Sequence, residues 1–241
     1  MLVAAAVCPH PPGLVPAVSL GAAGDLAELR AACLDAVGRL AGARPDAVVV
    51  VGVGPARAWP GYAGGGLEGY GVAVPIRLDP TAPTAAPTDA PDADPLPPSI
   101  AIGAWLLAAA GVRLPRTGCS LPVGTPPAEA AALGARLVAG PSRTALLVLG
   151  DGSARRAVEA PGTLDARAAA YDGLVARALA AGDPGGLLAL DPGLAEQLLV
   201  AGRAPWQALA GAAGTGSWRG ELLFDGAPLG VGAPVSGWAP T

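Results

Sequence analysis

Residues 45–54, PDAVVVVGVG, constrain the fold of this chain more than any other segment. Four consecutive valines leave no polar position that would face water on either side of a strand. A strand of this kind is buried on both faces, as in a parallel sheet that helices cover on both sides. The segment therefore predicts an α/β architecture.

Strand-like and helix-like segments alternate along the rest of the chain. Apolar runs predict further strands, and apolar residues at helical spacing predict helices between them. The two last strands are expected to form an antiparallel pair around the Asp225-Gly226 turn. The predicted strands lie at 2–7, 71–78, 143–152, 220–226 and 229–238, and the helical patterns at 24–42, 99–111, 128–140, 165–181 and 183–211. This alternation predicts one α/β domain over residues 1–241, with a mostly parallel or mixed central sheet flanked by helices.

Residues 79–98 interrupt the alternation with many Pro, Asp, Thr and Ala residues and no apolar periodicity. Such a segment is either a linker between two domains or a surface excursion within one. We favour the excursion, because the helix predicted at 99–111 needs a sheet to cover. Residues 58–72, which are rich in glycine, are expected to form a loop.

Two segments of the chain share one pattern. Residues 48–57, VVVVGVGPAR, and residues 146–155, LLVLGDGSAR, each run from an aliphatic strand through Gly-x-Gly to Ala-Arg. Ligands of open α/β sheets bind beyond the carboxyl ends of the strands, so we expect both loops to line the mouth of a site. We expect His10, which follows the first strand, to join them there.

The two loops do not match the common nucleotide-binding motifs. The dinucleotide fingerprint needs a third glycine where this chain has Arg57 and Arg155, and the P-loop needs a lysine, which the chain lacks. A serine hydrolase would pair His10 with Ser153 or another serine, but the chain has no Gly-x-Ser-x-Gly elbow. The sequence argues against all three classes.

Charge and cysteine content restrict the partners and the compartment. The net charge is −4, and the fifteen basic residues are all scattered arginines, so no basic stripe for nucleic acid is present. Cys8, Cys33 and Cys119 lie far apart without a CxxC pair, which suggests free thiols in a reducing cytosol. No apolar run reaches the roughly 18 residues of a membrane helix. We expect a cytoplasmic protein that binds neither nucleic acid nor membrane, in an oligomeric state that the sequence leaves open.

Several segments, in this order along the chain, carry a resemblance to a known family. They are CPHPPGLVPAV (8–18), PDAVVVVGVGP (45–55), ALLVLGDGSARR (145–156), residues 160–212 and APLGVGAPVSGW (227–238). Together they resemble the LigB-like superfamily of class III extradiol ring-cleavage dioxygenases, which includes the Memo proteins, and within it an uncharacterised actinobacterial branch. The resemblance covers nearly the whole chain and implies a LigB-like α/β fold.

The resemblance also implies a non-haem Fe(II) held by two histidines and a carboxylate, with another histidine as the acid–base group. His10, in a His-Pro-Pro loop, matches the first metal ligand. Gly54 and Pro55 stand where the second histidine is implied, Ala154 where the acid–base histidine is implied, and Ala201 where Memo proteins have a cysteine. Because the chain has a single histidine, we expect a degenerate iron site and assign no cofactor.

The polar residues of these loops are the candidate site. The candidate catalytic group is His10, Asp151 and Ser153, and His10 is also the candidate metal ligand. The candidates for binding a small anionic or aromatic molecule are Gly54, Arg57, Gly152, Arg155 and Arg156. Each has a structural alternative: a loop histidine bonded to backbone, a turn or helix-cap aspartate, or a solvated arginine. Glu196 is a candidate for the third-ligand region or a residue on an exposed helix face.

Two classes of function stay open. The first is an enzyme with altered chemistry in the cleft, including an active extradiol-type dioxygenase or other oxidoreductase that uses Fe(II) or another divalent metal around His10. The second is a non-catalytic protein that keeps the fold for ligand binding or assembly. A small polar cleft that joins His10, Asp151 and Arg155 favours the first class, and a cleft filled by apolar side chains favours the second.

Overall fold

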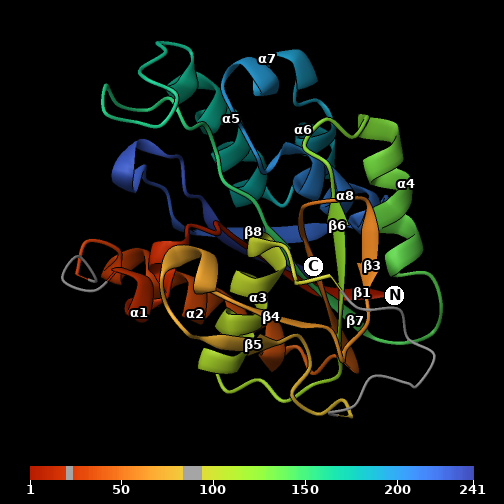
Figure 1. Cartoon of the computed structure of the whole chain (residues 1–241). Coiled ribbons are helices and arrows are strands. Elements are labelled where there is room, and N and C mark those ends of the chain that lie inside the picture. The colour runs from red at the N-terminus through yellow and green to blue at the C-terminus, as the bar shows by residue number, and fades with distance from the viewer. Residues whose placement is uncertain (20–23, 84–93) are drawn as a thin grey trace.

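A seven-stranded mixed sheet forms the centre of the computed structural model, which describes residues 1–19, 24–83 and 94–241 (Figure 1). Its strand order is β3-β6-β2-β7-β1-β9-β8. The four parallel strands are β1 (Leu2–Cys8), β2 (Ala47–Val53), β6 (Arg116–Leu121) and β7 (Thr144–Leu149). The other three strands form antiparallel pairs. β3 (Arg57–Trp59) pairs with β6, β9 (Val235–Pro240) pairs with β1, and β8 (Trp218–Phe224) pairs with β9.

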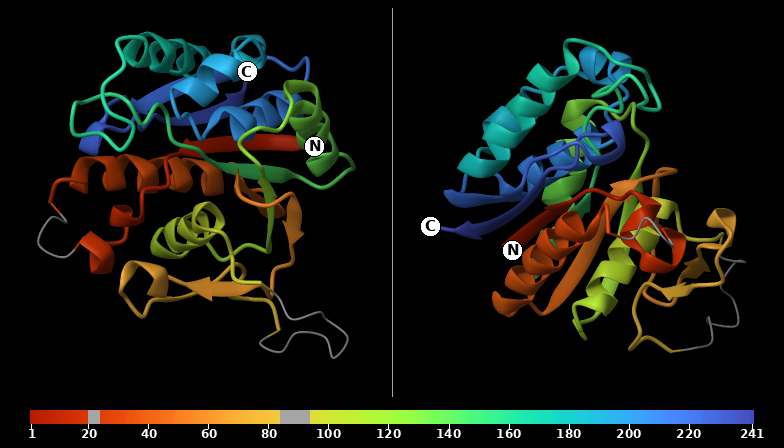
Figure 2. Two further views of the ribbon diagram at one scale, coloured as in Figure 1. Left: turned by 45° about the horizontal axis from the view of Figure 1, so that its top comes forward. Right: turned by 90° about the vertical axis from the view of Figure 1, so that its left-hand side faces the viewer.

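Different helices cover the two faces of the sheet (Figure 2). One face is covered by α2 (Ala27–Gly42) and α3 (Pro98–Ala109), and the other by α4 (Pro127–Leu137), α5 (Ala168–Ala181), α6 (Pro184–Leu188), α7 (Pro192–Gln197) and α8 (Arg203–Ala213). Side chains of a strand alternate between faces, so Val48 and Val50 join the first core while Val49 and Val51 join the second. The valine run has no polar residue because both of its sides are core.

Smaller elements connect this framework. The loop after β1 contains a 3-10 turn, η1 (Pro12–Leu14), and the short helix α1 (Pro16–Ser19). A separate two-stranded sheet consists of β4 (Gly64–Gly66) and β5 (Pro75–Arg77), with the 3-10 turn η3 (Glu68–Tyr70) between them. None of the described helices is both long and apolar enough to cross a bilayer.

The structure confirms the predicted α/β fold with helices on both sides of a mixed sheet, and it corrects several details. The strand β6 was not predicted. Residues 58–72 are not simply a loop, because they contain part of β3, all of β4 and η3. The predicted turn at Asp225-Gly226 is wrong: residues 225–234, with the 3-10 turn η4 (Pro228–Gly230), connect β8 to β9. Of the predicted surface excursion at 79–98, residues 84–93 lie outside the described residues.

Candidate functional site

The carboxyl ends of the four parallel strands open on one edge of the sheet. In the spatial order β6-β2-β7-β1, the loops that follow these strands begin at Pro122, Gly54, Gly150 and Pro9. Ligands of open α/β sheets bind at this edge. The loops after β7 and β1 are neighbours, which places Asp151 and His10 on adjacent strand ends.

His10 and Asp151 meet at this edge. The backbone N–H of His10 donates a hydrogen bond to Asp151 Oδ1 over 2.7 Å, and His10 Nδ1 lies 3.4 Å from the same oxygen. That ring nitrogen is buried and has no hydrogen-bond partner among the described residues. The two side chains are 14% and 20% exposed. The structure therefore joins two of the three residues predicted as a catalytic group.

Ser153, the third, holds the loop after β7 in place. Its side chain is fully buried, and its Oγ donates to the carbonyl of Leu198 over 2.8 Å and accepts from the N–H of Arg155. Its own N–H donates to the buried carboxylate of Asp172 over 2.9 Å. The hydroxyl is bonded within the protein and has no exposed surface, so the geometry gives Ser153 a structural role in place of the predicted catalytic one.

Asp172, on α5, anchors the same loop through Arg156. The Arg156 guanidinium donates to Asp172 Oδ2 over 2.7 Å. Burial raises the pKa of the Asp172 carboxyl, against the opposing effect of the bonds from Ser153 and Arg156. The Gly152 N–H donates to the carbonyl of Gly232, and a Cβ at Gly152 would lie 2.8 Å from Asp172 Oδ1. Arg156 and Gly152, predicted to bind a ligand, are thus engaged by partners within the protein.

The loop after β2 turns away from His10. The N–H of Gly54 donates to the carbonyl of Leu121 on β6, and the carbonyl of Pro55 accepts from Ser120 Oγ. A Cβ on Gly54 would meet Ser120 Cβ at 3.1 Å. These contacts direct the chain across β6 and into β3, so Gly54 lies against β6 and not beside the imidazole.

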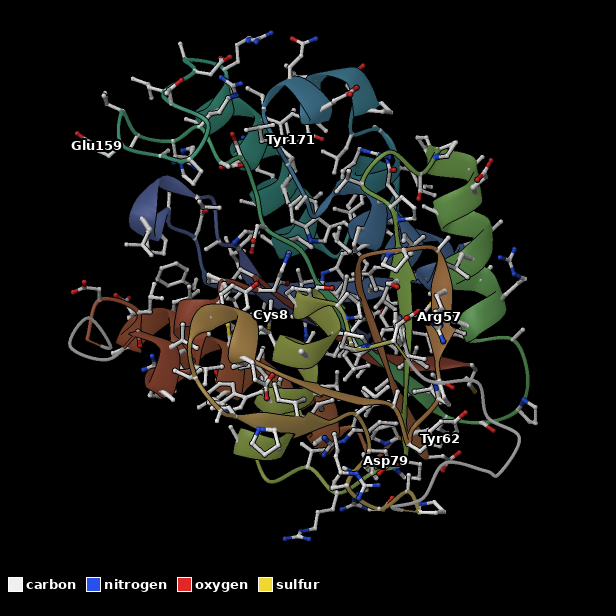
Figure 3. All side chains as sticks on the ribbon, viewed as in Figure 1. Cys8, Arg57, Tyr62, Asp79, Glu159 and Tyr171 are labelled. Atoms are coloured by element: carbon white, nitrogen blue, oxygen red, sulfur yellow. The ribbon has the colours of Figure 1, made fainter. Side chains whose placement is uncertain are left out.

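Arg57 follows that loop to the far edge of the sheet. Its guanidinium pairs with Asp94 over 2.5 Å and lies 4.6 Å from the ring centre of Trp59. Figure 3 shows Arg57 well apart from Cys8, at the end of β1. The two similar loops were predicted to share one mouth, and this expectation is wrong for Arg57, because β3 pairs on the outer side of β6.

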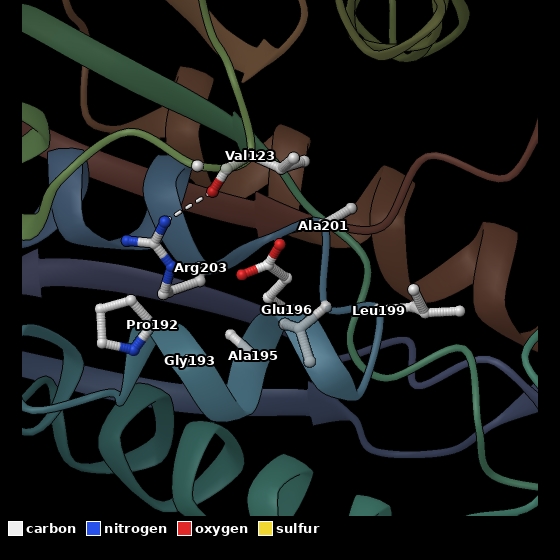
Figure 4. Close-up of a pocket in the computed structure, with 10 residues that line it drawn as sticks. Val123, Pro192, Gly193, Ala195, Glu196, Leu199, Ala201 and Arg203 are labelled. Atoms are coloured by element: carbon white, nitrogen blue, oxygen red, sulfur yellow. Dashed lines mark hydrogen bonds between the residues drawn. The ribbon is translucent and has the colours of Figure 1, made fainter.

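A cavity of about 400 Å³ opens beside α7 and the loop that follows β6 (Figure 4). Its walls come from the loop after β6, from α7, from the segment between α7 and α8, and from the first turn of α8. The lining residues are Val123, Gly124, Pro192, Gly193, Ala195, Glu196, Leu199, Val200, Ala201 and Arg203. The N–H of Gly202 donates to the backbone carbonyl of Asp151 over 2.8 Å, so this segment adjoins the loop after β7, although the side chains of His10 and Asp151 are not among the lining residues.

Arg203 is the buried cation of this cavity. It is 2% exposed, and its guanidinium donates to Gln207 Oε1 over 2.7 Å and to the carbonyl of Val123 over 2.5 Å. Both acceptors are neutral, and no carboxylate of the described residues pairs with it within 4.0 Å. Burial lowers the pKa of the guanidinium, but arginine keeps its charge in proteins. The charge is therefore buried without an acidic partner in the part of the chain that the structure describes.

The position of Arg203 in its helix makes its uncompensated positive charge less favourable still. Arg203 is the first residue of α8, where the helix dipole favours anions and disfavours cations. The first turn has no acidic residue, and the N-cap, Gly202, has no side chain that could accept from the free N–H groups. Both the side chain and the helix terminus therefore favour an anion in the cavity.

The remaining walls are mostly apolar. Val123 and Leu199 are 53% and 47% exposed, although both are large hydrophobic residues. Leu199 also has a left-handed backbone with φ of 55°, a conformation that costs energy for any residue except glycine. Glu196, on α7, directs its carboxylate into the cavity (Figure 4) and has no hydrogen-bond or ion-pair partner among the described residues.

Comparisons with known proteins bear on the fold. No family model matches the chain, and no curated protein matches it. Solved structures do match it, among them the crystal structure of the uncharacterized protein JW3007 from Escherichia coli K12. That structure has a TM-score of 0.51 and 16% sequence identity over 98% of this chain and 99% of that one. At this identity the likeness supports the shared α/β fold alone.

Arg155 lies one side chain away from the cavity. A Cβ built on Gly162 would lie 2.7 Å from Arg155 Cγ and 2.6 Å from Leu199 Cδ1, so both side chains pack on the same glycine. Arg155 Nε is buried without a hydrogen-bond partner, and no described carboxylate pairs with its guanidinium. Among the arginines predicted to bind a ligand, Arg155 is thus close to the cavity, while Arg57 and Arg156 are paired elsewhere.

The residues present do not fit the iron centre that the family resemblance implies. The imidazole of His10 is the only one in the chain, and no three His, Cys, Asp or Glu side chains of the described residues are placed to hold a metal. Cys8 and Cys33 are both buried, and the neighbouring Cys8 thiol together with burial raises the pKa of Cys33. A raised thiol pKa keeps the Cys33 sulfur protonated, which makes it a poor metal ligand.

Sequence reasoning missed Arg203 and the cavity that it lines. Glu196 was noted, but as a metal-ligand candidate or an exposed residue. The available signal was the segment AGRAPW (201–206): an arginine directly after glycine, at the start of a helix whose first turn carries no acid. The helix dipole disfavours a cation at this position, and a nearby anion would offset that cost.

Proposed function

We propose that this chain is a LigB-like protein with a degenerate iron site, which binds a small organic anion in the cavity at the carboxyl edge of its sheet. The observation that carries the proposal is Arg203: a cation that is 2% exposed, lines the cavity and has only neutral partners among the described residues. The retained cleft then serves ligand binding, or chemistry other than ring cleavage.

The energetics of Arg203 support an anionic ligand. A buried charge is costly unless it is paired and hydrogen-bonded, and the positive end of α8 adds to the cost. A carboxylate or phosphate would offset both, because the planar guanidinium matches the two oxygens of such a group.

Iron-dependent ring cleavage is not part of the proposal. That chemistry requires a facial triad with open coordination positions and an acid–base imidazole. In this chain the corresponding positions are Gly54, Pro55 and Ala154, and Gly54 packs against Pro97 and Ser120. His10 and Asp151 remain as one imidazole beside one carboxylate, and neither lines the cavity that Arg203 lines.

A thermal-shift and calorimetric screen of acetate, benzoate, malonate and inorganic phosphate tests the anion site. A ligand that binds only the folded state at about 100 times its Kd stabilises it by about 2.7 kcal/mol. We expect at least one anion to raise the wild-type Tm and to lose this effect in Arg203→Gln. Arg113→Gln is the control, since Arg113 is an exposed arginine without a described acidic partner.

Arg155→Ala separates two locations for the anion. If Arg155→Ala abolishes the shift while Arg203→Gln retains it, the anion binds at the loop after β7 and the cavity assignment is wrong. Equal shifts in all variants, or none, would leave the arginine without a ligand and refute the proposal. Arg203→Lys keeps the charge and guards against misfolding of the glutamine variant: it is expected to retain a weaker shift, since ammonium lacks the planar fork.

A further inference from the structure

The cavity that holds Arg203 also carries one charge of the opposite sign. Figure 4 shows the Glu196 carboxylate pointing into the cavity from α7, on the same side as the Arg203 guanidinium. From this pair we infer that the ligand is an amino-acid-like zwitterion with an apolar side chain. The inference rests on the proposed anion site at Arg203 and adds the chemistry of the rest of the ligand.

The two charges do not neutralise each other. No nitrogen of Arg203 lies within 4.0 Å of a Glu196 oxygen, although both side chains line one cavity. The guanidinium is fixed by Gln207 and Val123, so it does not move freely towards the carboxylate. A ligand with a carboxylate on Arg203 and an ammonium group facing Glu196 satisfies both groups at once.

Arg203 and Glu196 differ in burial, so they should contribute unequally to binding a ligand. Arg203 is buried, so it acts in a surrounding of low dielectric where a charge pair is strong. Glu196 is exposed on α7, so its attraction for an ammonium group is weaker and screened by salt. We therefore expect the carboxylate to supply most of the affinity and the amine to supply selectivity.

The apolar walls fit the body of such a ligand. Val123 and Leu199 leave about half of their surface exposed at the rim, and Ala195, Val200 and Pro192 add apolar surface. The volume of about 400 Å³ lies in the range of small-molecule sites, roughly 300–1,000 Å³. A branched aliphatic or aromatic side chain would cover these residues. Among the described residues no cation besides Arg203 lines the cavity, so an acidic group on that side chain would have no charged partner there.

Glu196 also disfavours a competing ligand class. A dicarboxylate or a phosphate ester carries extra negative charge, which would face the carboxylate of Glu196 and be repelled. A single carboxylate with a positive group next to it avoids this repulsion. Ligand chemistry in the cavity is thus restricted from two sides, by what Arg203 attracts and by what Glu196 repels.

Isothermal titration with matched ligands tests the inference. The amino acids are L-leucine and L-phenylalanine, the acids that lack the amine are isocaproate and hydrocinnamate, and the amines that lack the carboxylate are isoamylamine and phenethylamine. In wild type we expect an amino acid to bind about two- to fivefold more tightly than its matched acid, the size of an exposed ion pair, and the amines to bind most weakly.

Glu196→Gln is the deciding variant. It should remove the preference for the amino acid over the acid while leaving affinity for the acid unchanged or slightly raised, and the preference in wild type should weaken as salt is added. Glu159→Gln is the matched control, because Glu159 is exposed (Figure 3) and does not line the cavity. Ala201→Leu, which fills the cavity and removes no charge, should weaken binding of amino acid and acid alike.

The two possible failures are distinguishable. If acids bind through Arg203 but no amino acid binds better, or if the preference persists in Glu196→Gln, the zwitterion inference is wrong and the anion site stands. If neither acids nor amino acids bind in a way that depends on Arg203 and on the open volume at Ala201, the proposed function fails with it.

Discussion

Arg116 and Arg203 are equally buried, each 2% exposed, yet their surroundings differ. The Arg116 guanidinium donates to the carbonyls of Leu78, Ala104 and Val112, and its charge is countered by nearby Asp79. Arg203 has two neutral partners, no described carboxylate partner and a cavity beside it.

The comparison separates two uses of a buried arginine. Burial lowers the pKa of both guanidiniums, so burial alone does not mark a binding site. Neither arginine forms an ion pair within 4.0 Å among the described residues. What marks Arg203 is open space beside it and the lack of a nearby carboxylate such as Asp79. Arg116 ties β6 to α3 and to the segment after β5, whereas Arg203 lines an open cavity, where we propose that it binds an anion.

The largest expected effect is the loss of stability in Arg116→Met. This variant leaves buried carbonyls without a donor and Asp79 without its counter-charge, which should lower the free energy of unfolding by about 3–5 kcal/mol. Arg203→Gln should cost about 1–2 kcal/mol, since fewer groups lose a partner. Urea denaturation measures both, and equal losses would remove the distinction between the two arginines.

A second prediction concerns the glycines of the two similar loops. A Cβ on Gly150 would lie 2.4 Å from the Cα of Gly202, directly before α8, while a Cβ on Gly54 meets its nearest atom, on Pro97, at 3.0 Å. Gly150→Ala should therefore lower the free energy of unfolding by about 1–3 kcal/mol, and Gly54→Ala by less.

The same pair of variants links stability to the site. Because Gly150→Ala displaces the start of α8, it should also weaken anion binding at Arg203, measured by titration on the folded fraction. Gly54→Ala should leave binding unchanged. An anion affinity that falls equally in both variants would mean that the loop after β2 does belong to the site.

These two loops also show what the sequence could and could not predict. The strands before them were predicted because every position is apolar, and a buried strand needs no further information. The directions of the loops depend on Ser120, whose Oγ accepts from Trp59 Nε1 and donates to Pro55, drawing one loop to the sheet edge. Those partners are far apart in sequence, so similar local patterns led to a wrong shared site for Arg57.

The strand β6 was missed for a related reason. Its residues, RTGCSL, lack an apolar run, and it is buried because it pairs with β2 and β3. For the site, the positions of His10 and Asp151 followed from the rule that ligands gather at strand carboxyl ends. Arg203 lies on a helix that follows no central strand, so no loop rule leads to it.

The third prediction contrasts Asp79 and Asp172, two carboxylates that are each 6% exposed. Burial raises the pKa of Asp172, and its bonds from Ser153 and Arg156 do not outweigh this. Burial also acts to raise the pKa of Asp79, but bonds from Thr81 and from the N–H of Arg116 outweigh it, so this pKa is lowered. The two groups should therefore give opposite pH dependences.

The signs follow from which state binds the proton more tightly. The folded state binds the proton of Asp172 more tightly than the unfolded state does. The contribution of Asp172 to stability therefore falls as the pH rises from 3.8 towards the raised pKa. The unfolded state binds the proton of Asp79 more tightly than the folded state does. Asp79 therefore stabilises the folded state above pH 3.8, and this stabilisation is lost as the pH falls through the lowered pKa. Denaturation of wild type, Asp172→Asn and Asp79→Asn across acidic pH measures this. Curves that diverge from wild type in the same direction would contradict it.

The smallest expected effect is that of His10→Ala on metal and on the anion. A chain with one histidine cannot supply the two histidines of the facial triad. Neither wild type nor His10→Ala should therefore hold iron near one equivalent after anaerobic Fe(II) loading. Neither protein should convert catechols into a yellow ring-opened product. The Nδ1 of His10 faces Asp151 and not Arg203, so an anion-dependent rise in Tm should also survive the substitution. If wild type holds stoichiometric iron and His10→Ala does not, a metal binds beside Asp151. The functional site would then lie at the loops after β1 and β7. A retained anion effect without iron would assign binding to the end that holds Arg203.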